Sequence, residues 1–234
     1  MDSILEVNGL VKRYPTFFLD NISFSLPEGC VLGFIGANSA GKTTTIRSIL
    51  NLAHKDAGTI KIFGLDTVKH EQEIKDRIGI VMDGSYFYNE LSMQDMKSII
   101  APAYSKWSDA DYRSYMEKFE LDPKQKISTL SKGMRMKFAL VLALSHNAEL
   151  LIMDEPTSAL DPQLTQEVLS VIRQLADEKR TMIVVTHEMN FARDVADRVI
   201  YMANGLVVED GPAKQVLGND RSEAIRAFAG KSDY

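Results

Sequence analysis

Residues 36–43 read Gly36-Ala37-Asn38-Ser39-Ala40-Gly41-Lys42-Thr43 and fit the pattern G-x-x-x-x-G-K-[ST]. They follow the apolar run Val31–Ile35, which predicts a buried strand, and they precede a stretch that predicts a helix. Glycines permit the tight turn that points backbone N–H groups at a phosphate, and the helix adds the positive end of its dipole. The alternative, an ordinary glycine-rich turn, does not require the lysine and threonine. The stretch therefore predicts a phosphate-binding loop.

The side chains of this loop predict binding of ATP together with Mg²⁺. Lys42 is placed to reach the β- and γ-phosphates, and the Thr43 hydroxyl is placed to ligate Mg²⁺. Lys42 is thus a candidate catalytic residue as well as a binding residue. The residues expected to contact ATP through the loop are Gly36, Ala37, Asn38, Ser39, Ala40, Gly41, Lys42, Thr43 and Thr44.

A second motif, Leu150-Leu151-Ile152-Met153-Asp154-Glu155, is an apolar run that ends in two carboxylates. Such a run predicts a buried strand that delivers both side chains to the carboxyl edge of a sheet, where α/β proteins bind ligands. We expect Asp154 to bind Mg²⁺ and Glu155 to polarise the attacking water. A general base of this kind contributes roughly 10²–10⁴-fold to a rate. Carboxylates often end strands for structural reasons, so the motif gains its weight from the phosphate loop before it.

The remaining pattern indicates an α/β protein whose core is a parallel sheet covered by helices. Further continuous apolar runs at Ile78–Met82 and Met182–Val185 predict strands that are buried on both faces. Residues 1–30 alternate and contain a turn, which predicts part of an antiparallel β subdomain at the edge of the core. Residues 84–146 are mainly helical in pattern and predict an inserted helical lobe. We expect residues 1–234 to form a single domain.

Composition excludes several classes of protein. Twenty-seven basic against 32 acidic residues give a net charge of −5, which argues against a nucleic-acid partner. No apolar run approaches the roughly 20 residues of a membrane-spanning helix, and the first residues do not resemble a signal peptide. The single cysteine fits a reducing compartment. We therefore expect a soluble protein that contacts a membrane only through a partner.

Together with shorter motifs, these residues resemble the nucleotide-binding subunit of ATP-binding cassette (ABC) transporters over essentially the whole chain. Leu130-Ser131-Lys132-Gly133-Met134 lies where the family has its Leu-Ser-Gly-Gly-Gln signature. Ser158-Ala159-Leu160-Asp161 matches the D-loop, and Thr186-His187 matches the switch histidine after a strand. Tyr14, 22 positions before Gly36, matches the aromatic residue that stacks on adenine. Each alone would more often be structural, so their joint order makes the resemblance specific.

The resemblance implies a P-loop NTPase fold with a RecA-like core and the activity of a transport ATPase. In the family, two subunits lie head to tail, and the signature of one closes on the ATP of the other. Ser131, Lys132 and Gly133 would then contact the partner's ATP, Asp161 would set geometry across the interface, and His187 would contact the γ-phosphate as a catalytic residue. The implied partners are a second copy or a similar subunit and a transmembrane permease. The implied location is the cytoplasmic face of the cell membrane, and the permease would determine the substrate.

Four positions depart from the family pattern. Asp83 stands where the family has a glutamine that touches Mg²⁺, so we expect a carboxylate ligand and activity that survives in weakened form. Lys132 and Met134 replace glycine and glutamine in the signature, and the charge of Lys132 is compatible with a nearby phosphate. Ser39 replaces a usual glycine of the phosphate loop, which puts the backbone turn there in question.

The two parts of the chain resemble different subfamilies. Up to about residue 155, Phe87–Leu91 and Ser131–Met134 resemble subunits of ABC-2-type exporters, whereas Thr157–Pro162 and later segments resemble subunits of polar amino-acid importers. We therefore consider a chimera joined near residue 155, with a natural lineage of mixed features as the alternative. Because the helical lobe lies in the exporter-like part, an exporter-type permease is the expected partner. The competing function is an ATP-binding scaffold with weak or no hydrolysis, and a soluble ABC ATPase of translation or DNA repair fits less well.

Overall fold

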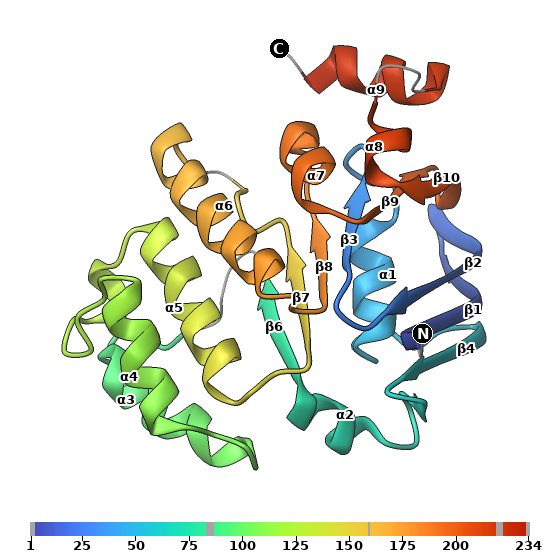
Figure 1. Cartoon of the computed structure of the whole chain (residues 1–234). Helices are drawn as coiled ribbons and strands as arrows, with labels where there is room; N and C mark the ends of the chain where they lie inside the picture. Colours follow the sequence, from blue (N-terminus) through green and yellow to red (C-terminus); the bar gives the residue numbers. More distant parts are fainter. Residues whose placement is uncertain (1–2, 83–86, 159, 219–221, 233–234) are drawn as a thin grey trace.

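The computed structural model describes residues 3–82, 87–158, 160–218 and 222–232, which form two β-sheets and surrounding helices (Figure 1). The strands are β1 (Ser3–Tyr14), β2 (Phe17–Pro27), β3 (Val31–Ile35), β4 (Ala57–Ile62), β5 (Leu65–Asp66), β6 (Ile78–Met82), β7 (Leu150–Asp154), β8 (Met182–Val185), β9 (Arg198–Ala203) and β10 (Leu206–Pro212). The α-helices are α1 (Lys42–Ile49), α2 (Glu71–Arg77), α3 (Met93–Ile100), α4 (Asp109–Lys118), α5 (Lys132–Ser145), α6 (Pro162–Asp177), α7 (Met189–Val195), α8 (Ala213–Val216) and α9 (Glu223–Ser232). Two 3₁₀ turns span Ala101–Ala103 and Ile127–Thr129.

The larger sheet has the strand order β10-β9-β3-β8-β7-β6, in which β10 alone runs antiparallel to its neighbour. The predicted strands at residues 31–35, 78–82 and 182–185 are confirmed. The strand predicted in the second motif is β7, and it includes Asp154 as its last residue. Because β6, β7, β8 and β3 are parallel, their carboxyl ends share one edge of the sheet. The expectation of a parallel core covered by helices is therefore correct.

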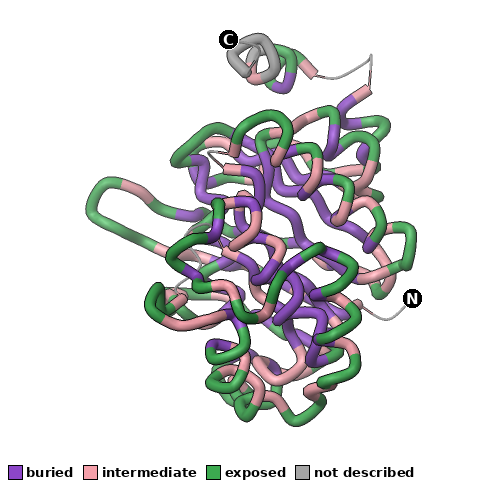
Figure 2. Tube along the Cα trace, turned by 90° about the vertical axis from the view of Figure 1, so that its left-hand side faces the viewer, coloured by how far each residue is buried: buried purple, intermediate pink, exposed green. Residues whose placement is uncertain are grey.

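Each face of this sheet packs against its own hydrophobic core. Because successive side chains point to opposite faces, the central parallel strands are mostly apolar. Leu151 and Met153 of β7 join the core formed with α5 and α6, whereas Leu150 and Ile152 join the core formed with α1 and the second sheet. Buried residues accordingly run through the centre of the molecule, and exposed residues lie at its periphery (Figure 2).

The second sheet is antiparallel and has the order β2-β1-β4-β5. Residues 1–30 supply β1 and β2, whereas β4 and β5 come from the stretch after α1. The sheet does not extend the edge of the parallel sheet. Its apolar residues pack with Ile46 and Ile49 of α1 in one core, so it forms a layer over the helix that follows the phosphate loop.

Between β6 and β7, all the named elements are helical, and in Figure 1 they lie at the lower left of the sheet. Only one isolated bridge, between Ser92 and Lys126, interrupts this pattern among the described residues. The treatment of residues 84–146 as an inserted lobe stays a prediction. Among the described helices, none combines the length and apolar character that crossing a membrane requires.

Candidate nucleotide-binding site

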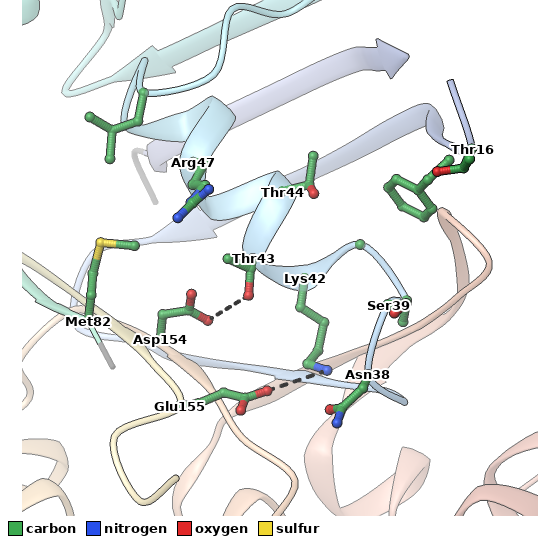
Figure 3. A pocket seen from close by; sticks show the side chains of 14 residues that line it. Thr16, Asn38, Ser39, Lys42, Thr43, Thr44, Arg47, Met82, Asp154 and Glu155 are labelled. Atoms are coloured by element: carbon green, nitrogen blue, oxygen red, sulfur yellow. Dashed lines mark hydrogen bonds and ion pairs between the residues drawn. The ribbon is translucent and has the colours of Figure 1, made fainter. Parts of the chain in front are cut away.

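An open cleft of about 880 Å³ lies at the carboxyl edge of the parallel sheet (Figure 3). Strand register brings its carboxylates there, because Met82 pairs with Asp154 and Asp154 pairs with Val185. The cleft is lined by Thr16, Phe17, Asn38, Ser39, Ala40, Gly41, Lys42, Thr43, Thr44, Arg47, Leu52, Met82, Asp154 and Glu155. The phosphate loop and the second motif, more than a hundred residues apart in sequence, therefore share one site.

The backbone of residues 36–41 turns through conformations that favour glycine. Gly36 has φ 145° and Gly41 has φ 108°. A Cβ atom at Gly36 would lie 2.2 Å from the carbonyl oxygen of Met202, so the loop lies directly against β9. Ser39 has φ 68° and adopts the left-handed conformation without being glycine, at a cost of roughly 1–2 kcal/mol. The substitution at this position therefore preserves the turn.

Lys42 is the first residue of α1, and its side chain folds back into the loop. The residue is 4% exposed, and its Nζ donates hydrogen bonds to the carbonyl oxygens of Gly36 (2.7 Å) and Ala37 (3.0 Å). The same atom lies 3.8 Å from Oε1 of Glu155. Burial lowers the pKa of Lys42, and the two nearby carboxylates act in the opposite direction. The ammonium is thus held at the point where a bound phosphate would neutralise its charge.

Thr43 and Asp154 form the other polar contact of the cleft. Thr43 Oγ1 donates to Asp154 Oδ1 at 3.3 Å, and burial raises the pKa of this carboxyl. A hydroxyl and a carboxylate are oxygen donors of the kind Mg²⁺ prefers when substrate phosphates and water complete its shell. The described residues contain no cluster of three or more His, Cys, Asp or Glu for a metal. The pair therefore fits a cation that is held jointly by protein and nucleotide.

Glu155 lies one residue beyond β7 and has a left-handed backbone, with φ 50°. Its N–H donates to the carbonyl of Val185 in β8 at 3.0 Å, so the strained residue is attached to the neighbouring strand. Strain of this kind in a residue other than glycine is typical of functional sites. The carboxylate lines the cleft beside Lys42 (Figure 3).

The signature residues lie at the start of α5 and do not line this cleft. Ser131 caps the helix by accepting a hydrogen bond from the Met134 N–H at 3.1 Å. Gly133 is buried, and a Cβ there would lie 3.1 Å from Leu164 of α6. The structure therefore gives Gly133 a packing role within its own chain, in addition to the close approach to a partner's ATP that the resemblance implies.

Asp161 and His187 also lie outside the residues that line the cleft. Asp161 caps α6 by accepting from the Leu164 N–H at 2.9 Å. His187 follows β8, its ring is 52% exposed, and Nε2 lies 3.9 Å from Oε1 of Glu188. The buried Thr186 before it accepts from the Glu188 N–H at 3.0 Å, which fixes the turn that presents the imidazole.

The structure does not bring Tyr14 into the cleft. Tyr14 is 44% exposed at the end of β1, and Lys12 Nζ lies 5.3 Å from its ring centroid. Phe17, its cross-strand partner, lines the cleft instead together with Thr16. The sequence reasoning did not single out these residues or Arg47. The signal available for Phe17 was an aromatic side chain three positions after Tyr14, within the predicted antiparallel stretch of residues 1–30. Asp83 lies outside the described residues.

The comparisons with known proteins agree with this geometry. The model of the family described as ABC transporter matches residues 19–158. The chain belongs to the ABC transporter family. Its fold matches a solved ATP-binding subunit of an ABC transporter with a TM-score of 0.84 at 24% identity, over 99% of this chain and 100% of the other. A dimeric ATP-binding cassette bound to ADP and Pi matches with a TM-score of 0.77 at 23% identity, over 89% of this chain and 98% of the other.

The curated relatives of this ABC subunit are transport ATP-binding proteins. The L-cystine transport system ATP-binding protein TcyN of Escherichia coli (strain K12) is 36% identical, over 98% of each chain. The arginine transport ATP-binding protein ArtM of Bacillus subtilis (strain 168) is 33% identical, over 97% of this chain and 99% of its own. These alignments run across residue 155, so the comparisons give no support to a chimera or to an exporter-type first part. As a member of this family, the chain is an ATPase that binds ATP with Mg²⁺.

Proposed function

We propose that this chain is the ATP-hydrolysing subunit of an importer for polar amino acids. The proposal is supported by relatives whose names refer to transport of cystine, arginine and glutamate and whose alignments cover 97–98% of this chain. Alignments of this extent favour an importer-type permease over the exporter-type permease that the helical lobe suggested. The exporter-like sequence features would then occur in a subunit that functions in import.

One observation carries the catalytic part of the proposal: Lys42, Asp154 and Glu155 converge on a single cleft, together with Thr43. Lys42 and the backbone N–H groups of residues 36–43 would bind the β- and γ-phosphates. Mg²⁺, held by Thr43 and Asp154, would neutralise charge on the phosphate oxygens. Glu155 would orient the water and accept its proton as the water oxygen bonds to the γ-phosphorus and the bond to the leaving ADP oxygen breaks.

The residues outside the cleft would complete the site from a second copy of the chain. Ser131 and Gly133 lie at the N-terminus of α5, where a helix favours anions, and the γ-phosphate of a facing subunit would bind there. His187 would contact the γ-phosphate in its own chain, since its ring follows β8 and is 52% exposed. Asp161 would fix the approach of the two subunits. The pair would sit on the inner face of the cell membrane and contact it only through the permease.

The decisive experiment compares steady-state ATPase activity and oligomeric state in the parent chain and in Glu155→Gln. We expect turnover in the parent, and loss of turnover with an ATP-stabilised dimer in the variant, because the amide keeps the shape of the carboxylate but cannot accept the proton. Glu117→Gln, which changes an exposed carboxylate of α4, is the control and should behave as the parent. A folded parent that binds ATP but never hydrolyses it would instead identify the chain as an ATP-binding scaffold.

The amino-acid specificity would be tested separately, because it resides in the permease. We expect the chain, produced together with an importer permease of the cystine or arginine type, to copurify with it and to support ATP-dependent uptake. Glu155→Gln should copurify equally well but support no uptake. An ATPase that associates only with exporter-type permeases would contradict the import function while leaving the hydrolytic function intact.

A further inference from the structure

Lys132, which replaces a glycine of the family signature, contacts the D-loop of its own chain. Its Nζ donates a hydrogen bond to the backbone carbonyl of Ser158 at 2.5 Å. Lys132 is the first residue of α5, a position where the helix dipole disfavours a cation. The positive charge of Lys132 therefore lies at the end of α5 where it is electrostatically unfavourable. The hydrogen bond to the Ser158 carbonyl offsets this cost.

Ser158 is in turn bonded to the catalytic carboxylate residue. The N–H of Ser158 donates to the carbonyl of Glu155 at 3.0 Å, and the Glu155 side chain lies 3.8 Å from Lys42 Nζ. One peptide segment thus connects the start of α5 to the residue that faces the nucleotide of the same chain. Since Glu155 has a left-handed backbone, its conformation needs such support from neighbouring groups.

The contacts around this segment hold the first turns of α5 and α6 together. Gly133 packs against Leu164, whose N–H is capped by Asp161. Farther along the same two helices, Lys137 Nζ lies 2.8 Å from Oε2 of Glu167. The pair of Lys137 and Glu167 joins α5 to α6 and lies farther along both helices than residues 155–161, which makes Lys137 a matched control for Lys132.

We propose that Lys132 is a positioning residue that tethers the Ser158 carbonyl and thereby fixes the backbone of Glu155 for hydrolysis. The inference rests on the proposed ATPase function and adds a link to it. An end of α5 that binds the partner's nucleotide is joined through Lys132 and Ser158 to the water-orienting carboxylate of its own chain. Closure of one composite site would then be transmitted to the other within the same subunit.

The first test measures amide hydrogen exchange in the nucleotide-free full chain, for the parent, Lys132→Met and Lys137→Met. The amides of Ser158 and Leu160 donate to the carbonyls of Glu155 and Thr157. We expect these amides to exchange about tenfold faster in Lys132→Met, since loss of a hydrogen bond from a charged donor loosens the segment by roughly that factor. Lys137→Met should leave them unchanged. Equal exchange in both variants would overturn the tether.

The second test measures kcat and KM for ATP in the same proteins and in Lys132→Arg. We expect Lys132→Met to lower kcat about tenfold with KM within about twofold, because Lys132 Nζ binds the Ser158 carbonyl of its own chain and the phosphate loop is untouched. Lys132→Arg, which restores a cationic donor, should recover part of kcat, and Lys137→Met should match the parent. Faster exchange with unchanged kcat would overturn the catalytic role. A parent without turnover would instead overturn the proposed function, and the exchange comparison would still decide the tether.

Discussion

The Lys42 ammonium lies 3.8 Å from the Glu155 carboxylate but donates its shorter hydrogen bonds to the Gly36 and Ala37 carbonyls. In this arrangement a buried cation is held mainly by neutral acceptors, and its burial lowers its pKa. A buried charge without close neutralisation is costly to the fold. The buried Lys42 charge therefore lowers the stability of the fold, and it places a cation where a phosphate can bind.

Lys42→Met tests this relationship. We expect the free energy of unfolding to stay within about 1 kcal/mol of the parent or to rise, because an apolar side chain of similar length relieves the buried charge. ATP affinity should fall at least about a hundredfold, since the γ-phosphate loses a desolvated cation. Urea unfolding and nucleotide titration measure the two effects. A variant that loses several kcal/mol of stability would show that the ammonium is structural.

Gly36→Ala should destabilise the chain far more than Gly64→Ala. Both glycines have positive φ, but a Cβ at Gly36 would meet the Met202 carbonyl oxygen at 2.2 Å, whereas nothing lies within 4 Å at Gly64. We expect a loss of about 3 kcal/mol or more at position 36 and about 1 kcal/mol at position 64, where only backbone strain acts. Denaturant unfolding decides between them. Equal losses would mean that β9 yields to the added methyl group.

The phosphate loop and the buried strands could be predicted because each depends on local pattern. Gly36 and Lys42 lie at fixed spacing, and β7 is buried along its whole length and apolar up to Met153 because both of its faces are covered. β9 and β10 were not predicted. β10 alternates between exposed and half-buried residues, whereas β9 contains the buried apolar run at residues 199–202, which was a readable signal. β9 takes its place in the sheet by pairing with β3, and β10 by pairing with β9, and the local pattern encodes neither pairing.

Within the site, the limits of the sequence were long-range contacts. Phe17 lines the cleft and packs against the core that contains Ile46 of α1, whereas Tyr14, its partner across the hairpin, is exposed. The contact of Lys132 with Ser158 joins segments 26 residues apart and could not be read from the signature motif. Motif spacing predicted which residues matter, whereas tertiary packing determined what each one touches.

Phe17→Ala should weaken ATP binding more than Tyr14→Ala. Phe17 lines the cleft beside the phosphate loop, and its ring lies 3.0 Å from the position of a Cβ on Gly41. Loss of a stacking ring costs roughly 1–3 kcal/mol per base, so we expect the Kd for ATP to rise about tenfold. Tyr14→Ala should change it less than about threefold. Equilibrium binding of ATP to both variants makes the comparison, and the reverse order would restore the family assignment of Tyr14.

His146 should make the protein sensitive to acid below neutral pH. The residue is 1% exposed, its ring stacks on Tyr104 at 3.8 Å between centroids, and neither ring nitrogen has a hydrogen-bond partner among the described residues. Burial lowers the pKa of His146 from 6.5 to about 4. As the pH falls below 6.5, His146 binds a proton in the unfolded chain but stays neutral in the folded chain. Folding stability is therefore lost between pH 6.5 and pH 4.

The size of this loss and its control follow from the same shift. A depression of this size corresponds to about 3 kcal/mol, which His146→Phe should remove while keeping a ring to stack on Tyr104. We expect the unfolding free energy of the parent to fall by about 3 kcal/mol more than that of His146→Phe between pH 7 and pH 4. The control variant is His70→Phe, which replaces a ring that is 46% exposed rather than buried and is measured over the same pH range. Parallel pH profiles for the parent and His146→Phe would contradict this prediction. They would mean that a partner or a water molecule stabilises the charged imidazole inside the fold and keeps its pKa near the ordinary value.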